Sequence, residues 1–117
     1  MKLFVDDVRV PQEVYFDGGN WAVARTYEEA IDCLKSGNVT VLSLDHNLAG
    51  LKTGYDILCW MEENNVWPKE VCLVHSKDPA GAARMLMVIN RYSDLRGQQG
   101  GRRDAIITKT PGSINRY

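Results

Sequence analysis

Residues that can bind metal ions or move protons follow directly after the apolar runs of this sequence. The pairs are Asp6-Asp7 after 2–5, Asp45-His46 after 39–44 and His75-Ser76 after 71–74, and Lys109 follows 105–108. If these runs are parallel strands of one sheet, their carboxyl ends lie along a single edge, which is where open α/β sheets bind ligands. We therefore expect these polar side chains to converge on one crevice.

Three of these residues are aspartates, Asp6, Asp7 and Asp45. Like charges held close together are costly unless a cation joins them. Oxygen ligands from carboxylates, carbonyl groups and water favour Mg²⁺. The sequence therefore predicts a divalent cation, Mg²⁺ first, on these aspartates. The alternative is that each aspartate only caps a turn or a helix, which is the better explanation for any one of them alone.

Positive and hydroxyl groups at the same edge can complete a phosphate site. Lys109 and Arg9 supply charge, Ser76 supplies a hydroxyl, and a helix predicted to start near Asp78 adds backbone N–H groups. We expect Arg9, Ser76 and Lys109 to bind phosphate. For Arg9, an ordinary solvated surface position is an equally good explanation.

The two histidines, His46 and His75, leave more than one chemistry open. Histidine titrates near neutral pH, so one could activate water and the other protonate the leaving alkoxide of a phosphodiester. Alternatively, Asp45 attacks phosphorus and a histidine helps to hydrolyse the acyl phosphate. Each imidazole could also simply hydrogen-bond a neighbouring loop. We expect Asp45, His46 and His75 to be the catalytic residues.

The remaining pattern along the chain alternates strands with helices. Short apolar runs predict strands at 2–5, 21–24, 39–44, 71–74 and 105–108. A capping-box spacing at Thr26 and Glu29 begins a helix that Gly37 closes, Thr53 begins a second helix to about Asn64, and Asp78-Pro79 begins a third.

The segment from Val8 to Asn20 contains Pro11 and Gly18-Gly19 and should be a loop with at most one helical turn. Only eight residues follow Lys109, which is too few for a closing helix. Alternation of strands and helices predicts an α/β fold with an open parallel sheet of about five strands, three-layered, with its first crossover helix reduced and its last one missing. Tyr15 and Phe16, in the first loop, could cover a base or ribose.

Length and composition set limits on the molecule. A chain of 117 residues, 44% hydrophobic and 25% charged, fits one globular domain over 1–117. The net charge of −1 gives no global attraction to duplex nucleic acid or to an anionic membrane. No apolar stretch can span a bilayer and no secretory pattern begins the chain, so we expect a cytoplasmic protein.

The order of these residues resembles the receiver domain of two-component response regulators. That family has an acidic pair after its first strand, then an aspartate, a serine or threonine and a lysine after later strands, matched here by Asp6-Asp7, Asp45, Ser76 and Lys109. The resemblance implies a flavodoxin-like fold and adds the Asn47 carbonyl as a metal ligand. The histidines beside Asp45 and Ser76, and Thr110 between Lys109 and Pro111, depart from the usual receiver pattern.

The sequence is more similar still to the cyclic-phosphate processing receiver family. Its members share four motifs, which occur in this chain as Asp6-Asp7-Val8-Arg9, Ser43-Leu44-Asp45-His46-Asn47-Leu48, Thr53-Gly54-Tyr55-Asp56 and His75-Ser76. The resemblance implies a small phosphate-containing ligand, with a cyclic nucleotide as one candidate.

Three functions follow from these observations. The first is a metal-dependent phosphoesterase-like protein acting on a cyclic or diester phosphate of a small nucleotide or RNA end. The second is a non-catalytic module, either a receiver phosphorylated on Asp45 or a binder that sequesters a cyclic nucleotide. The third is an interaction domain, since a missing last helix would leave a sheet face for a homodimer or a protein partner to cover.

Overall fold

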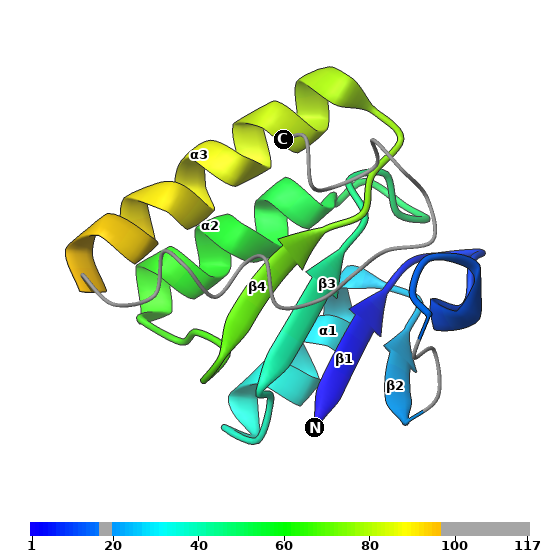
Figure 1. The fold of residues 1–117 in the computed structure, drawn as a ribbon, viewed down its shortest axis with the longest axis horizontal. Helices are drawn as coiled ribbons and strands as arrows, with labels where there is room; N and C mark the ends of the chain where they lie inside the picture. Colours follow the sequence, from blue (N-terminus) through cyan, green and yellow to red (C-terminus); the bar gives the residue numbers. More distant parts are fainter. Residues whose placement is uncertain (17–19, 97–117) are drawn as a thin grey trace.

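The computed structural model describes residues 1–16 and 20–96. The elements, in chain order, are β1 (Lys2–Val5), the 3₁₀ turn η1 (Pro11–Glu13), β2 (Trp21–Ala24), α1 (Tyr27–Lys35), β3 (Val41–Leu44), α2 (Gly54–Asn64), β4 (Val71–Val74) and α3 (Pro79–Arg96). Within the described ranges these match the predicted elements, except that β3 begins two residues later. Figure 1 shows their arrangement.

The four strands of the described residues form one parallel sheet in the order β2-β1-β3-β4. This confirms the α/β fold with a parallel sheet, and the order is that of the first four strands of flavodoxin-like proteins. The chain reverses its direction of winding between β1 and β3, which is the point where such sheets bind ligands. The predicted fifth strand at 105–108 lies outside the described residues.

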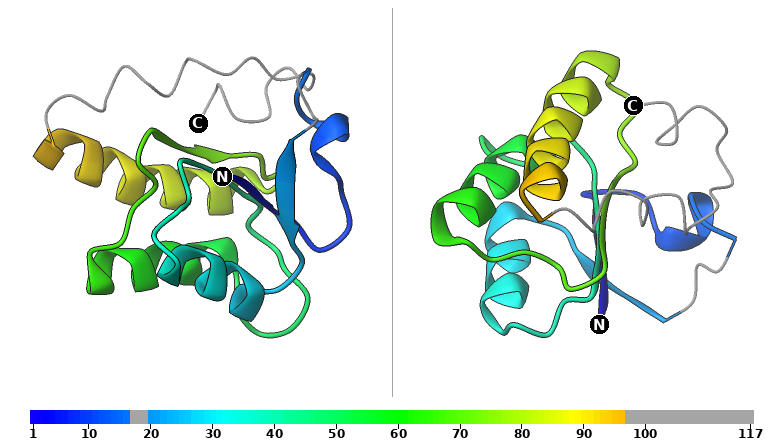
Figure 2. Two further views of the ribbon diagram at one scale, coloured as in Figure 1. Left: turned by 90° about the horizontal axis from the view of Figure 1, so that it is seen from below. Right: turned by 60° about the vertical axis from the view of Figure 1, so that its left-hand side comes forward.

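The two faces of the sheet are covered differently. Helices α1, α2 and α3 pack side by side on one face, and the η1 turn lies on the other (Figure 2). The predicted reduction of the first crossover helix is confirmed for the described part of the β1–β2 connection, where η1 is the one helical element. The predicted absence of a last helix concerns residues outside the described ranges. Among the described residues, no helix has the length and apolar character needed to cross a membrane.

Side chains at the helix starts explain where the helices begin. Thr26 accepts a hydrogen bond from the backbone N–H of Glu29, as its capping role predicts. Thr53 and Asp56 form a full capping box at the start of α2. Asp78 accepts from the N–H of Gly81 at the start of α3. Helix α2 ends at Asn64, and its C-cap residue Asn65 adopts the left-handed conformation.

Gly54 lets the start of α2 pass directly over the end of β3. Its N–H donates to the His46 carbonyl, and a Cβ at this position would lie 2.0 Å from the Asp45 carbonyl oxygen and 2.7 Å from Cε of Met85. A side chain cannot be accommodated against a backbone atom at that distance. The Thr53-Gly54 pair therefore fixes the loop that carries Asp45 and His46.

We predict that Gly54→Ala lowers the free energy of unfolding by about 2 kcal/mol or more, because the added methyl group must displace backbone. Gly37→Ala is the matched control: its Cβ would meet open space, but φ is +77°, so a loss of only about 1 kcal/mol is expected from backbone strain. Urea denaturation of both variants measures the difference. A loss for Gly54→Ala no larger than that for Gly37→Ala would show that the close approach is unimportant.

Candidate functional site

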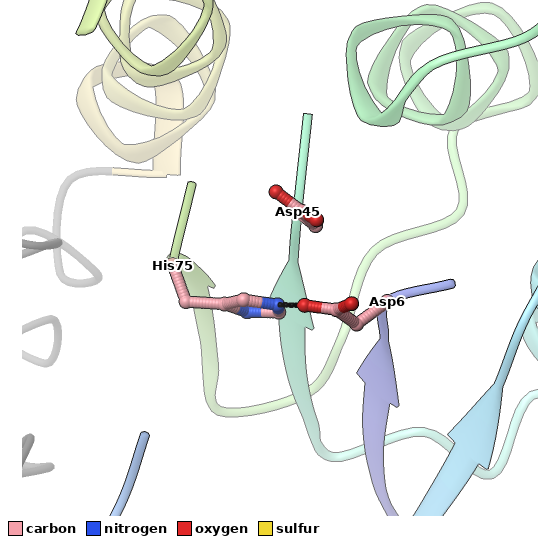
Figure 3. A group of neighbouring side chains, drawn as sticks. All are labelled: Asp6, Asp45 and His75. Carbon is pink, nitrogen blue, oxygen red and sulfur yellow. Dashed lines mark hydrogen bonds and ion pairs between the residues drawn. The ribbon is translucent and has the colours of Figure 1, made fainter. Parts of the chain in front are cut away.

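The strand register brings three polar residues side by side at the carboxyl edge of the sheet. Val5 pairs with Leu44 and Leu44 with Val74, so Asp6, Asp45 and His75 each come one residue past a paired position. Because side chains alternate along strands, all three face away from the helices. Figure 3 shows the Asp6 carboxylate and the His75 ring in line, with the Asp45 carboxylate beside them.

Asp6 is fully buried and its carboxylate is saturated with hydrogen bonds. Oδ1 accepts from the backbone N–H groups of Val8 (2.9 Å) and Arg9 (2.8 Å), and Oδ2 accepts from Arg9 Nε and from His75 Nε2 (both 3.1 Å). An ionised carboxylate offers about four acceptor positions. The protein itself therefore fills the acceptor capacity of Asp6.

These contacts decide the charge of Asp6. Burial raises the pKa of the carboxyl group, but the hydrogen bonds from His75 and from the N–H groups of Arg9 and Val8 outweigh that effect and hold the pKa well below its usual value. Asp6 is thus a permanently ionised group in the interior.

His75 is also completely buried. Its ring stacks on Phe4 with centroids 4.2 Å apart, Nε2 faces Asp6, and Nδ1 lies 2.7 Å from Oγ of Ser43. Burial lowers the pKa of His75 to about 4, although the hydrogen bond to Asp6 acts in the opposite direction. The ring is therefore neutral at pH 7, and its proton is on Nε2 because the Asp6 carboxylate can only accept.

A chain of buried hydrogen bonds continues beyond His75. With Nδ1 unprotonated, the Ser43 hydroxyl donates to it, and Ser43 in turn accepts from the Tyr15 hydroxyl. Serine, histidine and aspartate in contact resemble a hydrolase triad in composition. Ser43 is fully buried, however, so it cannot reach a ligand. Tyr15 is buried as well and stacks on Trp21, so the prediction that it covers a ligand is wrong, whereas Phe16 is exposed.

Asp45 differs from Asp6 in both hydrogen bonding and charge. Among the described residues its carboxylate accepts only from the N–H of His46, at 2.8 Å. Burial raises its pKa to about 6, and the negative charges of Asp6 and Asp7 add to the effect, against the His46 hydrogen bond and the positive charge of Arg9. The fold thus holds Asp45 in a place where its charge is destabilising.

Asp6, Asp45 and His75 have the composition of a metal site. One carboxylate oxygen from each aspartate and a ring nitrogen of His75 lie within 4.8 Å of one another. The nitrogen that faces Asp6 carries a proton, and Asp6 has no unused acceptor position. Asp45 is therefore the member of the cluster best able to offer a lone pair to a cation.

A pocket of about 380 Å³ opens at this edge of the sheet. Its walls are formed by Val8, Arg9, Asp45, Asn47, Ser76, Lys77 and Asp78. This volume lies within the usual range of small-molecule sites. Among the residues that the structure describes, Asp45 thus connects the buried cluster with the pocket.

His46 does not itself line the pocket, but it contacts Asn47 and Asp78, which do. Its ring packs against Gly81 so closely that a Cβ there would come within 2.5 Å of the ring. Nδ1 lies 2.9 Å from Oδ1 of Asn47 and 3.5 Å from Oδ2 of Asp78. Since both neighbours offer acceptor oxygens, Nδ1 of His46 is the nitrogen that donates to them.

The other predicted residues occupy different positions around the pocket. Arg9 lines it while bonding Asp6 and, through Nη2, the His75 carbonyl at 2.6 Å. Ser76 is buried and accepts from the Asp78 N–H at 3.0 Å. Asn47 is an exposed part of the wall, and Asp7 is half-buried and acts on Asp45 through its charge. Lys109 lies outside the described residues.

Sequence reasoning missed several residues that shape the site. Ser43 could have been found, because it is a polar residue within an apolar strand and shares a face with Asp45 two positions later. Lys77 and the pocket-facing role of Asp78 follow only from the structure. Arg25 Nη1 donates to the carbonyls of Asp6 (3.1 Å) and Arg9 (2.7 Å). No local sequence pattern predicts these two hydrogen bonds.

Comparison with known proteins agrees with this geometry. A family model described as cyclic-phosphate processing receiver domain matches residues 1–91. The chain belongs to this family. No match was found among curated proteins or among solved structures.

Family membership relates the aspartates at the sheet edge to the metal site of receiver domains. Receiver domains usually bind Mg²⁺ through aspartates, and this receiver domain places Asp6 and Asp45 together at the β1–β3 switch point. The cluster is compatible with phosphate chemistry in a cyclic-phosphate processing family. The buried position of His75 nevertheless argues against its direct proton exchange with a ligand.

The raised pKa of Asp45 makes a prediction about stability. Its folded pKa of about 6 exceeds the ordinary value of 3.8, so its ionisation destabilises the fold above pH 6 and the effect disappears as the pH falls below about 4. We expect Asp45→Asn to raise the free energy of unfolding at pH 7.5 on the order of 1–3 kcal/mol, given about 1.4 kcal/mol per pKa unit.

Denaturant titrations at pH 7.5 and pH 4 measure this difference. The exposed Asp32→Asn is the matched control and should change stability by less than about 0.5 kcal/mol at both pH values. Destabilisation of the protein by Asp45→Asn at pH 7.5 would contradict the prediction.

Proposed function

We propose that this receiver domain is a divalent-cation-dependent phosphoesterase-like protein that acts on a cyclic or diester phosphate of a small nucleotide or RNA end. The observation that carries the proposal is Asp45, an ionisable group with largely unused acceptor oxygens that the fold holds in the pocket wall at a cost in stability. Strongly perturbed groups in clefts are typical of functional sites.

The charges in the pocket wall support a phosphate ligand bound together with a cation. Arg9 and Lys77 bring two positive charges, and Asp45 and Asp78 bring two negative ones. A phosphate group entering this balanced wall adds negative charge close to Asp45. A divalent cation would offset that charge and would also relieve the repulsion between Asp45 and Asp6.

The residues fit Mg²⁺ held by oxygen atoms. Asp45 offers carboxylate oxygens, and Asp7 and Asn47 are the nearby oxygen donors predicted from the sequence. Asp6 contributes mainly its charge, because its own acceptor positions are filled. When bound, such a cation supplies Lewis-acid polarisation of the phosphoryl oxygens.

The remaining groups divide the other tasks. Arg9 and Lys77 attract the phosphate, and the Ser76 hydroxyl and the predicted Lys109 add contacts. His46 donates through Nδ1 to Asn47 and Asp78, which leaves Nε2 as the nitrogen for general-base catalysis. We therefore assign proton transfer to His46 and give His75 no direct contact with the ligand.

A second candidate function is a non-catalytic receiver phosphorylated on Asp45. It is favoured by the burial of His75, which leaves one histidine rather than two beside the pocket. Intact-mass measurement after treatment with a small phosphodonor distinguishes the two functions. An adduct that is lost in Asp45→Asn supports the receiver, and its absence together with turnover of a cyclic phosphate supports the enzyme.

Cation binding predicts a thermal shift. We expect Mg²⁺ at about ten times its Kd to stabilise the wild type by about 1.4 kcal/mol through ligand linkage. Asp45→Asn should abolish this increment and Asp32→Asn should preserve it, as measured by calorimetry with and without Mg²⁺. An equal Mg²⁺ increment in wild type and Asp45→Asn would remove Asp45 from the cation site.

Catalysis predicts turnover that depends on His46. In the presence of Mg²⁺, the wild-type protein should hydrolyse at least one nucleotide of a panel of 2′,3′-cyclic and 3′,5′-cyclic nucleotides. Chromatography of the products measures the rate. His46→Ala should reduce the rate about 100-fold or more, the usual contribution of a general acid or base. Absence of turnover for the whole panel, or equal rates for wild type and His46→Ala, would exclude the proposed reaction.

A further inference from the structure

We infer that Tyr15, Ser43 and His75 are positioning residues of the phosphate site: the hydrogen-bonded chain that they form orients the Asp6 carboxylate, which fixes the Arg9 guanidinium in the pocket wall. The inference rests on the proposed phosphate-binding function and names residues that act beneath the pocket. None of the three lines it.

The chain has a single direction of donation. Asp6 can only accept, so His75 donates through Nε2 and accepts at Nδ1 from the Ser43 hydroxyl, and Ser43 accepts from the Tyr15 hydroxyl. Each member therefore determines the proton position of the next. Stacking of the His75 ring on Phe4 opposes a flip of the ring, which would place the carbons Cδ2 and Cε1 where Nδ1 and Nε2 now lie and so break both hydrogen bonds.

The oriented Asp6 carboxylate in turn fixes the position of the Arg9 side chain. Oδ2 of Asp6 accepts from both His75 Nε2 and Arg9 Nε at 3.1 Å, and the His75 carbonyl accepts from Arg9 Nη2 at 2.6 Å. The guanidinium plane is thus held at two of its nitrogens. From the other side, Arg25 binds the carbonyl of Arg9 and so fixes the turn itself.

The cost of burying these groups argues for a role beyond packing. Tyr15, Ser43, His75 and Asp6 are all fully buried in a region that also contains Phe4 and Trp21. Buried polar groups are tolerated when every partner is satisfied, but an apolar core of the same shape is often equally stable or more stable. The four buried residues lie beneath Arg9, which lines the pocket, and they hold it in one orientation. A pre-oriented arginine loses less entropy when it binds phosphate, so this arrangement would favour phosphate binding.

The experiment compares Ser43→Ala, Tyr15→Phe, His75→Leu and His75→Gln with the wild type, all in the full chain. Two quantities are measured: the hydrogen exchange of the Arg9 Nε–H group by NMR, and the affinity for inorganic phosphate in the presence of Mg²⁺ by calorimetry. Tyr27→Phe, which removes a hydroxyl from half-buried Tyr27 on α1, is the matched control for Tyr15→Phe.

In the wild type we expect the Nε2–H tautomer of His75 in long-range proton–nitrogen spectra and slow exchange of the Arg9 Nε–H. Ser43→Ala and His75→Leu should accelerate that exchange and weaken phosphate binding by about tenfold, the lower end of the effect of removing an orienting partner. His75→Gln retains an N–H donor toward Asp6 and should recover most of the loss. Tyr15→Phe should act in the same direction as Ser43→Ala, and Tyr27→Phe should have no effect.

Wild-type exchange and wild-type phosphate affinity in folded Ser43→Ala and Tyr15→Phe would overturn the inference, even if His75→Leu fails to fold. Failure of His75→Gln to perform better than folded His75→Leu would also contradict it. If the wild type binds no phosphate at all, the proposed function fails, and the Arg9 exchange rates alone decide the positioning role.

Discussion

The close approach of the Asp6 and Asp45 carboxylates is the constraint on which the site depends. Parallel pairing of β1 with β3 places both residues one step beyond the same register position, so neither can move away without breaking the sheet. The two carboxylates have different surroundings. Hydrogen bonds stabilise the ionised Asp6, whereas Asp45 is left with a raised pKa beside the pocket. One carboxylate becomes part of the scaffold, and the other remains available to a cation or a ligand.

The same division separates the two histidines. His75 is the first residue after β4 and faces the side where Phe4 stacks on it, whereas His46 is the second residue after β3 and, by alternation, turns to the helix side and packs on Gly81. A difference of one position along the strand end therefore changes an imidazole from a buried hydrogen-bond partner into a group beside the pocket. This assignment explains how one site can contain two histidines with only one suited to proton transfer.

Much of the architecture could be predicted from the sequence, because apolar runs and capping residues are local signals. Thr53 and Asp78 cap the helices that they are predicted to begin, and the residues that follow the described strands lie along one edge of a parallel sheet. Burial could not be predicted in the same way. Tyr15 comes from a loop that local patterns suggest is exposed, and its contact with Ser43 depends on how the η1 segment folds back over the sheet. Long-range contacts such as Arg25 with the Asp6 carbonyl have no local signal at all.

The central claim is that burial, together with the charge of Asp6, raises the pKa of Asp45 towards neutrality, and that Asp45 is available to a cation. An NMR titration of its side-chain carboxyl carbon, with and without Mg²⁺, tests this claim most directly. The account predicts a pKa of about 6 in the absence of Mg²⁺ and a clear decrease when Mg²⁺ is added. An ordinary aspartate pKa that Mg²⁺ leaves unchanged would contradict it.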